Sequence, residues 1–273
     1  MTGFRARVDP PWDLASWRAA ARHAFAAGLA PEQVDWSGEA QGGLLPWPGL
    51  DQAPLPPDPP QPAVPAAFLD LAARVLCHRD PQRHALLYRM LCRIGHGERQ
   101  LLERSTDADV ARARALEKSV RRDTHKMKAF VRFRAVPGEE ETYIAWFEPE
   151  HFIVDRVAPF FARRFAGMRW TIVTPYRSAR WDGERLWAGP GGLRAEVPAE
   201  DAHDGLWRTY YASIFNPARL NTRMMRQEMP QKYWHLLPEA QLLPTLVREA
   251  GLRVRDMAER EPQPPRRRIP RRP

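Results

Sequence analysis

Cysteine is scarce in this 273-residue chain, and long apolar runs do not occur in it. Cys77 and Cys92 lie in apolar, helix-like segments and form no CxxC pair, so the sequence predicts no disulfide framework and no zinc or iron–sulfur site. No apolar stretch approaches the roughly 18 residues that cross a membrane. The opening residues also lack the apolar segment of a signal peptide. We therefore expect a cytoplasmic protein without a membrane partner.

The motifs of common catalytic centres are also missing. There is no Walker A loop, no GxSxG nucleophile elbow and no GxGxxG dinucleotide fingerprint. The eight histidines are scattered and form no HxxxH pair. The sequence therefore predicts no metal and no cofactor, and it leaves any catalytic residues unknown.

Positive charge, in contrast, is in excess. The chain has 42 Lys and Arg residues against 33 Asp and Glu residues, a formal net charge of +9. A polyanion such as nucleic acid is the natural partner for this excess. An arginine-biased proteome would give the same total, so the clustering of the charges has to decide. The ten tryptophans supply aromatic surface for packing or for stacking on bases.

Composition divides the chain into four segments. Residues 1–41 hold an alanine-rich helix at 13–29, with Asp13 as its cap. Residues 42–65 are so rich in proline that helix interior and central strand are excluded, which predicts an extended connector. Residues 66–252 form the core domain. An Arg/Pro-rich tail at 253–273 has no means of packing and is expected to be disordered.

The core segment alternates between two periodicities. Helical spacing of apolar residues appears at 63–79, 81–96, 106–126, 151–165, 201–215, 217–228, 230–236 and 238–250. Strand patterns appear at 129–136, 142–148, 169–175 and, around an Asp-Gly turn, at 177–187. The expected fold class is α+β, with a small antiparallel sheet (about 129–188) packed against helices from both ends of the chain.

The helix expected at 106–126 carries the strongest functional signal. Thr106 and Asp109 resemble a capping box at its start. An apolar stripe comprises Val110, Ala113, Leu116, Val120 and Met127. A cationic stripe, rotated by about 100° from it, comprises Arg114, Lys118, Arg121, Arg122 and His125. The spacing predicts one buried face and one basic face.

Further basic residues surround that stripe. They are Arg112, Lys126, Lys128, Arg132 and Arg134, and only Glu117 and Asp123 oppose them between residues 112 and 134. Phosphates favour such a run because each contact releases counterions, and arginine binds phosphate with two parallel hydrogen bonds. The alternative is a solvated face with internal ion pairs.

Two smaller groups are candidate contacts. In the segment 216–234, Arg219, Arg223 and Arg226 fall on one helical face, with Lys232, Tyr233 and Trp234 nearby. These rings could stack on bases or fill the core. Tyr176 and Arg177 follow the buried strand 169–175, where they could border a groove or form a structural turn. The arginines of 266–272 would add weak, salt-sensitive affinity.

Four long blocks carry a family resemblance. They are HRDPQRHALLYRMLCRIG (78–95), VRRDTHKMKAFVRFR (120–134), EHFIVDRVAPFFARRFAGMRWTIVTPYRSARWDG (150–183) and YYASIFNPARLNTRMMRQEMPQKYWHLLPEA (210–240). Together they resemble the DUF4130 family, whose members are associated with DNA metabolism or repair. The resemblance implies a standalone relative of the domain that is fused to uracil-DNA-glycosylase-like proteins, encoded near a radical-SAM protein. Either protein is then a possible partner. The resemblance supplies no known reaction.

We therefore expect a DNA-binding protein that acts in repair or modification beside a separate partner enzyme. One alternative is an enzyme of unrecognised type acting on damaged DNA, with Asp155, Glu148 and His151 as residues to inspect in a pocket near the basic surface. Another is a protein-interaction adaptor without nucleic-acid contact. In that case acids such as Glu139, Glu140 and Glu141 would neutralise the basic stripes.

Overall fold

A computed structural model describes residues 3–36, 47–136, 138, 141–198, 212, 221–229, 231–237, 240 and 242–259. The helices within these residues are α1 (Leu14–Ala26), α2 (Ala66–Val75), α3 (Arg83–Gly95), α4 (Ala108–Phe130), α5 (Val154–Arg164), α7 (Thr222–Glu228) and α8 (Leu243–Glu259). The strands are β1 (Phe4–Arg5), β2 (Val34–Asp35), β3 (Arg134–Ala135), β4 (Thr142–Trp146), β5 (Arg169–Val173), β6 (Arg177–Trp181) and β7 (Leu186–Pro190). The fold class is α+β, as expected.

Local signals set several boundaries. Asp13 caps α1 by accepting the backbone N–H of Ser16, and Gly28 follows the helix with a φ of +68°, which favours glycine. The Asp80-Pro81 pair separates α2 from α3, as expected. Pro159, in contrast, does not break the helix that contains it, because α5 continues through it to Arg164.

Helix α4 differs from the expectation at both ends. Its N-cap is Asp107, whose carboxylate accepts the backbone N–H groups of Asp109 and Val110, so the predicted role of Thr106 is wrong. The helix continues to Phe130, and the predicted strand at 129–136 shrinks to β3. Met127 and Val131 are buried in the core, and this packing overrides the alternating pattern.

The five-stranded sheet has the order β3-β4-β5-β6-β7. Strands β4 and β5 pair in parallel, and the other three pairings are antiparallel. The expectation of a purely antiparallel sheet is therefore wrong in one pair, because α5 connects β4 to β5 as a crossover helix. The Asp-Gly turn between β6 and β7 is confirmed, with Gly183 at a φ of +107°. A separate small sheet pairs β1 with β2.

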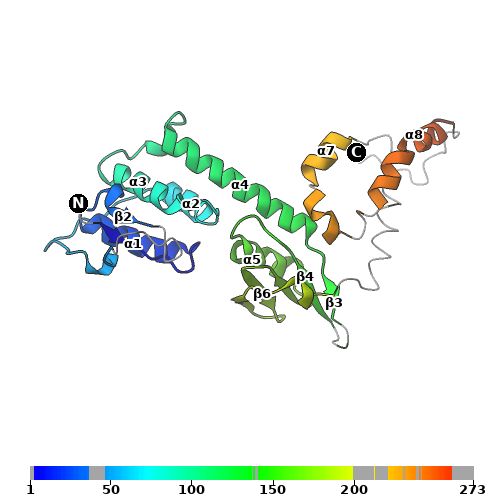
Figure 1. Cartoon of the computed structure of the whole chain (residues 1–273), viewed down its shortest axis with the longest axis horizontal. Coiled ribbons are helices and arrows are strands. Elements are labelled where there is room, and N and C mark those ends of the chain that lie inside the picture. The colour runs from blue at the N-terminus through cyan, green and yellow to red at the C-terminus, as the bar shows by residue number, and fades with distance from the viewer. Residues whose placement is uncertain are drawn as a thin grey trace, which may run out of the picture.

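Two hydrophobic cores meet along α4. The first contains Trp17, Phe68 and Tyr88, from α1, α2 and α3, together with Val110 from the start of α4. The second contains Met127 from the end of α4 with residues of α5 and the sheet. Figure 1 shows α4 along one edge of the molecule, with α2 and α3 beside its first half and α5 beside its second. The helix thus joins both cores.

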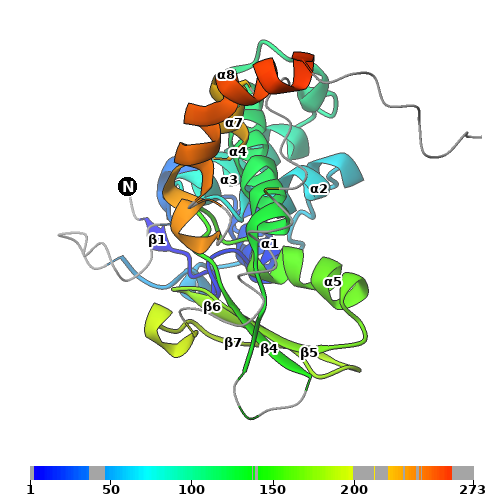
Figure 2. The same ribbon diagram turned by 90° about the vertical axis from the view of Figure 1, so that its right-hand side faces the viewer.

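The second core is layered. Helix α5 lies between α4 and the five-stranded sheet, and the other face of the sheet points away from the helices (Figure 2). A third, smaller cluster holds Leu237, Ala240 and Leu243 near the start of α8. Helix α8 extends to Glu259, beyond the end expected at residue 250.

Candidate nucleic-acid interface

The outward face of α4 contains the cationic stripe, which is the strongest functional signal predicted from the sequence. The apolar stripe of α4 is buried, as predicted. At 100° per residue, the five residues of the cationic stripe are centred roughly 150° from the buried positions, so the basic face points more directly into solvent than expected. Arg114, Lys118, Arg121, Arg122 and His125 are all exposed.

Among the described residues, most of these cations lack a carboxylate partner. Within the part of the chain that the structure describes, no carboxylate lies at ion-pair distance from Lys118, Arg121 or Arg122. Glu117, next to Lys118 in the sequence, pairs with Arg74 on α2 at 2.8 Å and lies 3.9 Å from Arg114. Asp123, next to Arg122, is buried and accepts the backbone N–H of His151. The face therefore keeps a net positive charge over about 16 Å of helix, from Arg114 to His125.

Two features anchor the start of this helix. Arg93 on α3 forms salt bridges with Asp107 at 2.7 Å and Asp109 at 3.1 Å, and hydrogen bonds from Arg93 hold the pKa of Asp107 at about 2. Arg112 pairs with Asp80 at 3.0 Å. Although burial alone raises the pKa of Asp80, the hydrogen bond from Arg112 lowers it overall. Arg112 is thus engaged in holding α4 against the α2–α3 turn.

The C-terminal end of the basic run is less available to a ligand. Lys126 is half-buried, and the ammonium of Lys128 lies 4.6 Å from the centre of the Phe160 ring. Arg132 donates to the carbonyls of Ala129 and Val131 at the end of α4.

The expectation that Arg134 is an exposed cation is wrong. Its side chain is buried, and its guanidinium donates to the carbonyl of Pro198 at 2.6 Å. The residue lies on β3 opposite Ile144, and its hydrogen bond brings Pro198 to this edge of the sheet. Arg134 therefore holds Pro198 and does not form part of the basic surface.

Tyr176 and Arg177 form a structural clamp. The Tyr176 hydroxyl accepts the backbone N–H of Val154 at the start of α5. Arg177 donates to Asp155 at 2.9 Å, and the same carboxylate accepts the indole N–H of Trp12. Of the two alternatives for this pair, these contacts favour the structural one, because both side chains contact Trp12 of the N-terminal segment or its partner Asp155 on α5.

The second basic segment is only partly described. Arg219 lies outside the described residues, and so do the side chains of Arg226 and Lys232 and the arginines of 266–272. Arg223 on α7 is exposed. Tyr233 is buried and stacks on Phe147 at a centroid distance of 5.2 Å, so of the two alternatives for this ring it fills the core and does not stack on bases.

A buried polar cluster lies beneath α4, and spacing in the sequence did not reveal it. His151 Nε2 is 2.8 Å from the Ser119 hydroxyl oxygen, and the His151 backbone N–H donates to Asp123. The Tyr233 hydroxyl lies 3.5 Å from the other oxygen of Asp123, and the His78 ring lies 4.1 Å from that of His151. Burial, followed by repulsion from His78, lowers the pKa of His151 to about 4. The imidazole is therefore neutral at neutral pH.

The other two residues named for an enzyme make ordinary contacts. Asp155 is shared by Trp12 and Arg177, and Glu148 accepts the indole N–H of Trp146. Within the described residues there is no group of three or more His, Cys, Asp or Glu side chains that could hold a metal. Of the acids named for the adaptor alternative, Glu139 and Glu140 lie outside the described residues and Glu141 is exposed.

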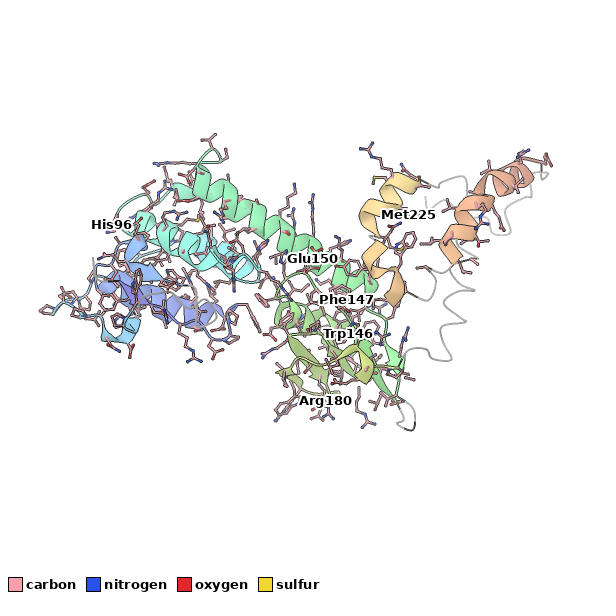
Figure 3. The ribbon with its side chains drawn as sticks, viewed as in Figure 1. His96, Trp146, Phe147, Glu150, Arg180 and Met225 are labelled. Atoms are coloured by element: carbon pink, nitrogen blue, oxygen red, sulfur yellow. The ribbon has the colours of Figure 1, made fainter. Side chains whose placement is uncertain are left out.

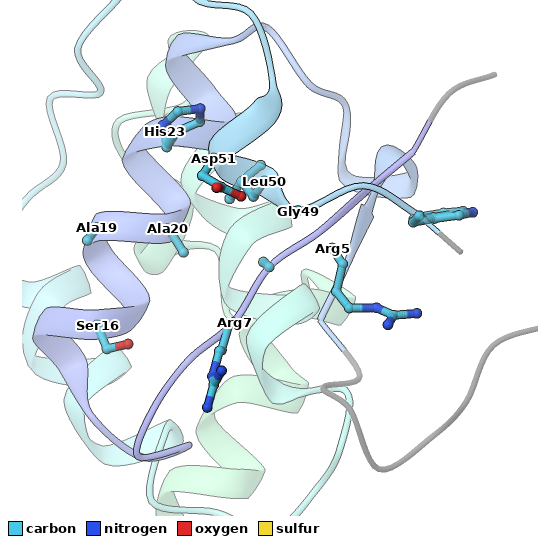
Figure 4. A pocket seen from close by; sticks show the side chains of 11 residues that line it. Arg5, Arg7, Ser16, Ala19, Ala20, His23, Gly49, Leu50 and Asp51 are labelled. Carbon is cyan, nitrogen blue, oxygen red and sulfur yellow. The ribbon is translucent and has the colours of Figure 1, made fainter. Parts of the chain in front are cut away.

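A pocket of about 530 Å³ lies in the N-terminal part of the chain (Figure 4). Ala19 and Ala20 of α1 line this pocket together with Arg5 and Arg7. Arg5 lies 3.4 Å from Asp35 and Arg7 lies 3.6 Å from Asp9. Since both guanidinium groups already face carboxylates, we assign this pocket no ligand.

Comparison with protein families gives one match. The model of a domain of unknown function, DUF4130, matches residues 81–239, which is more than half of the chain. The chain belongs to the DUF4130 family. No curated protein and no solved structure shows significant similarity to it.

The DUF4130 match contains α3, α4 and the five-stranded sheet, and thus the whole basic face. The segment before it, with α1 and α2, is held to the DUF4130 region by contacts of backbone carbonyls. The buried Arg83 donates to the Pro11 carbonyl at 2.8 Å, and His84 Nε2 lies 2.7 Å from the same oxygen. No helix among the described residues is long and apolar enough to cross a membrane.

Proposed function

We propose that this DUF4130 protein binds DNA along the outward face of α4. The observation that carries the proposal is the row of exposed cations, Lys118, Arg121 and Arg122, without carboxylate partners among the described residues. Duplex DNA carries one phosphate charge per about 1.7 Å of axis when both strands are counted, so a 16 Å length of duplex carries roughly nine phosphates, and those on its near side can face the helix. Flexible exposed cations can follow that spacing, and each contact releases counterions.

The setting is part of the same proposal. The protein acts in DNA repair or modification in the cytoplasm, beside a separate enzyme such as a radical-SAM or uracil-DNA-glycosylase-like protein. Two features support a binding role over a catalytic one. The cations of α4 are exposed on a helix surface, where contacts with a phosphate backbone would position DNA without reading its bases. The buried His151 is only 6% exposed, which restricts access of a large substrate to its ring.

Replacing Lys118, Arg121 and Arg122 together with alanine tests the proposal. Each lost phosphate contact reduces binding regardless of sequence, so we expect affinity for a duplex to fall by at least about tenfold at low salt. Fluorescence anisotropy with a labelled duplex measures it. A charge-matched control replaces the exposed Arg99, Arg163 and Arg255, which lie in the turn after α3, on α5 and on α8. Equal losses in the two variants would show that net charge alone drives binding and would contradict the proposed face.

A further inference from the structure

The face of the sheet that points away from α5 carries a row of side chains from four strands. Trp170, Ile172 and Ala179 are buried with α5 in the second core, so their neighbours along β5 and β6 point to the opposite side. The strand register places Ile144, Thr171, Arg180 and Trp187 next to one another across β4, β5, β6 and β7. We call Thr171, Arg180 and Trp187 the open row, because Ile144, beside the buried Arg134, is packed against the second core.

This face of the sheet is covered at one end of its strands and exposed at the other. Toward one end of the strands, the segment 191–198 lies over the sheet, where a Cβ on Gly192 would be 2.8 Å from Val173. At the other end, among the described residues, Arg180 is exposed and Trp187 retains 54% of its accessible surface. In Figure 3, Arg180 lies on the side of the sheet remote from α4.

Trp187 is held in place although it is exposed. Its indole N–H donates to Asp182 Oδ2 at 3.0 Å, which fixes the ring against the turn between β6 and β7. Arg180 is its direct cross-strand partner, and no carboxylate among the described residues pairs with Arg180. An ordered aromatic ring beside an available guanidinium suits a base and its neighbouring phosphate.

We propose that the open row binds single-stranded nucleic acid, with Trp187 stacking on a base and Arg180 contacting the adjacent phosphate. A duplex cannot use this surface in the same way, because its bases are already stacked on one another. This second surface would add binding of single-stranded nucleic acid to the duplex binding proposed for α4. Because α5 lies between α4 and the sheet (Figures 1 and 2), the outward face of α4 and the far face of the sheet are on opposite sides of these layers. The protein would thus hold paired and unpaired segments separately.

Binding to an oligothymidylate of about twelve nucleotides tests the assignment. We expect Trp187→Ala to weaken that binding by about fivefold or more, because one stacked base is lost, whereas Trp187→Phe keeps a ring and stays within about twofold of wild type. Arg180→Ala should weaken it as well. The control Leu193→Ala removes an apolar side chain that is 70% exposed, outside the row, and should change nothing. Equal affinities of wild type and Trp187→Ala would overturn the proposal.

Photocrosslinking locates the contact directly. An oligothymidylate carrying 5-iodouracil should crosslink to the tryptic peptide of residues 186–194, which contains Trp187 and ends at Arg194. Adducts found only on other peptides would exclude the open row.

Duplex binding, measured in parallel, separates this inference from the proposed function. The Lys118, Arg121 and Arg122 triple variant should lose duplex affinity while Trp187→Ala keeps it. Loss of duplex affinity in the triple variant, without any dependence of single-strand binding on Trp187, would sink only the open row. The reverse result would sink only the α4 face.

Discussion

Asp123→Ala should lower the free energy of unfolding by about 2–4 kcal/mol. The Asp123 carboxylate is 1% exposed and accepts the backbone N–H of His151 at 2.9 Å, with the Tyr233 hydroxyl 3.5 Å away. Alanine would leave a buried N–H without its acceptor at the contact between α4 and the loop before α5. Urea unfolding followed by circular dichroism measures the change, read from the midpoint at constant slope.

Asp123→Asn is the matched control for that prediction. The asparagine side chain keeps a carbonyl oxygen of similar position, so it can still accept from His151, and it removes the buried charge. We expect it to retain more stability than Asp123→Ala. An alanine variant as stable as wild type would show that the Asp123 cluster does not hold the loop.

Lowering the pH from about 6.5 to 4 should destabilise the protein through His84. Burial, aided by repulsion from Arg83, lowers the pKa of His84 from 6.5 to about 4. The unfolded state therefore binds a proton that the folded state excludes throughout this interval. The contribution of neutral His84 is fully present above pH 6.5 and is lost as the pH falls toward 4. A difference of about 2.5 pKa units corresponds to on the order of 3 kcal/mol.

His84→Gln isolates this contribution. His84 Nε2 lies 2.7 Å from the Pro11 carbonyl oxygen, and a glutamine amide can donate to the same oxygen without titrating. Urea midpoints at several pH values should show a smaller acid loss in the variant than in wild type. Some loss should persist, because the pKa of His151 is also lowered. Identical acid profiles for the two proteins would rule out His84 as the titrating group.

The basic face of α4 could be predicted from spacing because a helix converts sequence separation into direction. Arg114, Lys118 and Arg121 follow the apolar stripe at fixed offsets, so their exposure required no tertiary information. The extension of α4 to Phe130 could not be found in this way. Val131 and Phe133 alternate with arginines like a strand, and only the burial of Met127 and Val131 shows that the core holds this segment in another conformation.

The pairing of the strands also could not be predicted from the sequence. The parallel partnership of β4 and β5 depends on where α5 returns the chain, and no residue within either strand encodes it. The burial of Arg134 depends on Pro198, which is 64 residues further along the chain. The contact between Ser119 and His151 likewise joins residues 32 positions apart. Periodicity predicts which side of a helix or strand is buried. It does not predict which other helix or strand packs against that side.

The salt dependence of duplex binding tests the central claim most directly. The logarithm of the binding constant falls with the logarithm of salt concentration by about 0.9 per neutralised phosphate. If Lys118, Arg121 and Arg122 each contact a phosphate, the slope of the triple alanine variant should be shallower than that of wild type by roughly 2–3. The Arg99, Arg163 and Arg255 control should keep the wild-type slope. Equal slopes for wild type and the α4 variant would contradict binding by this face.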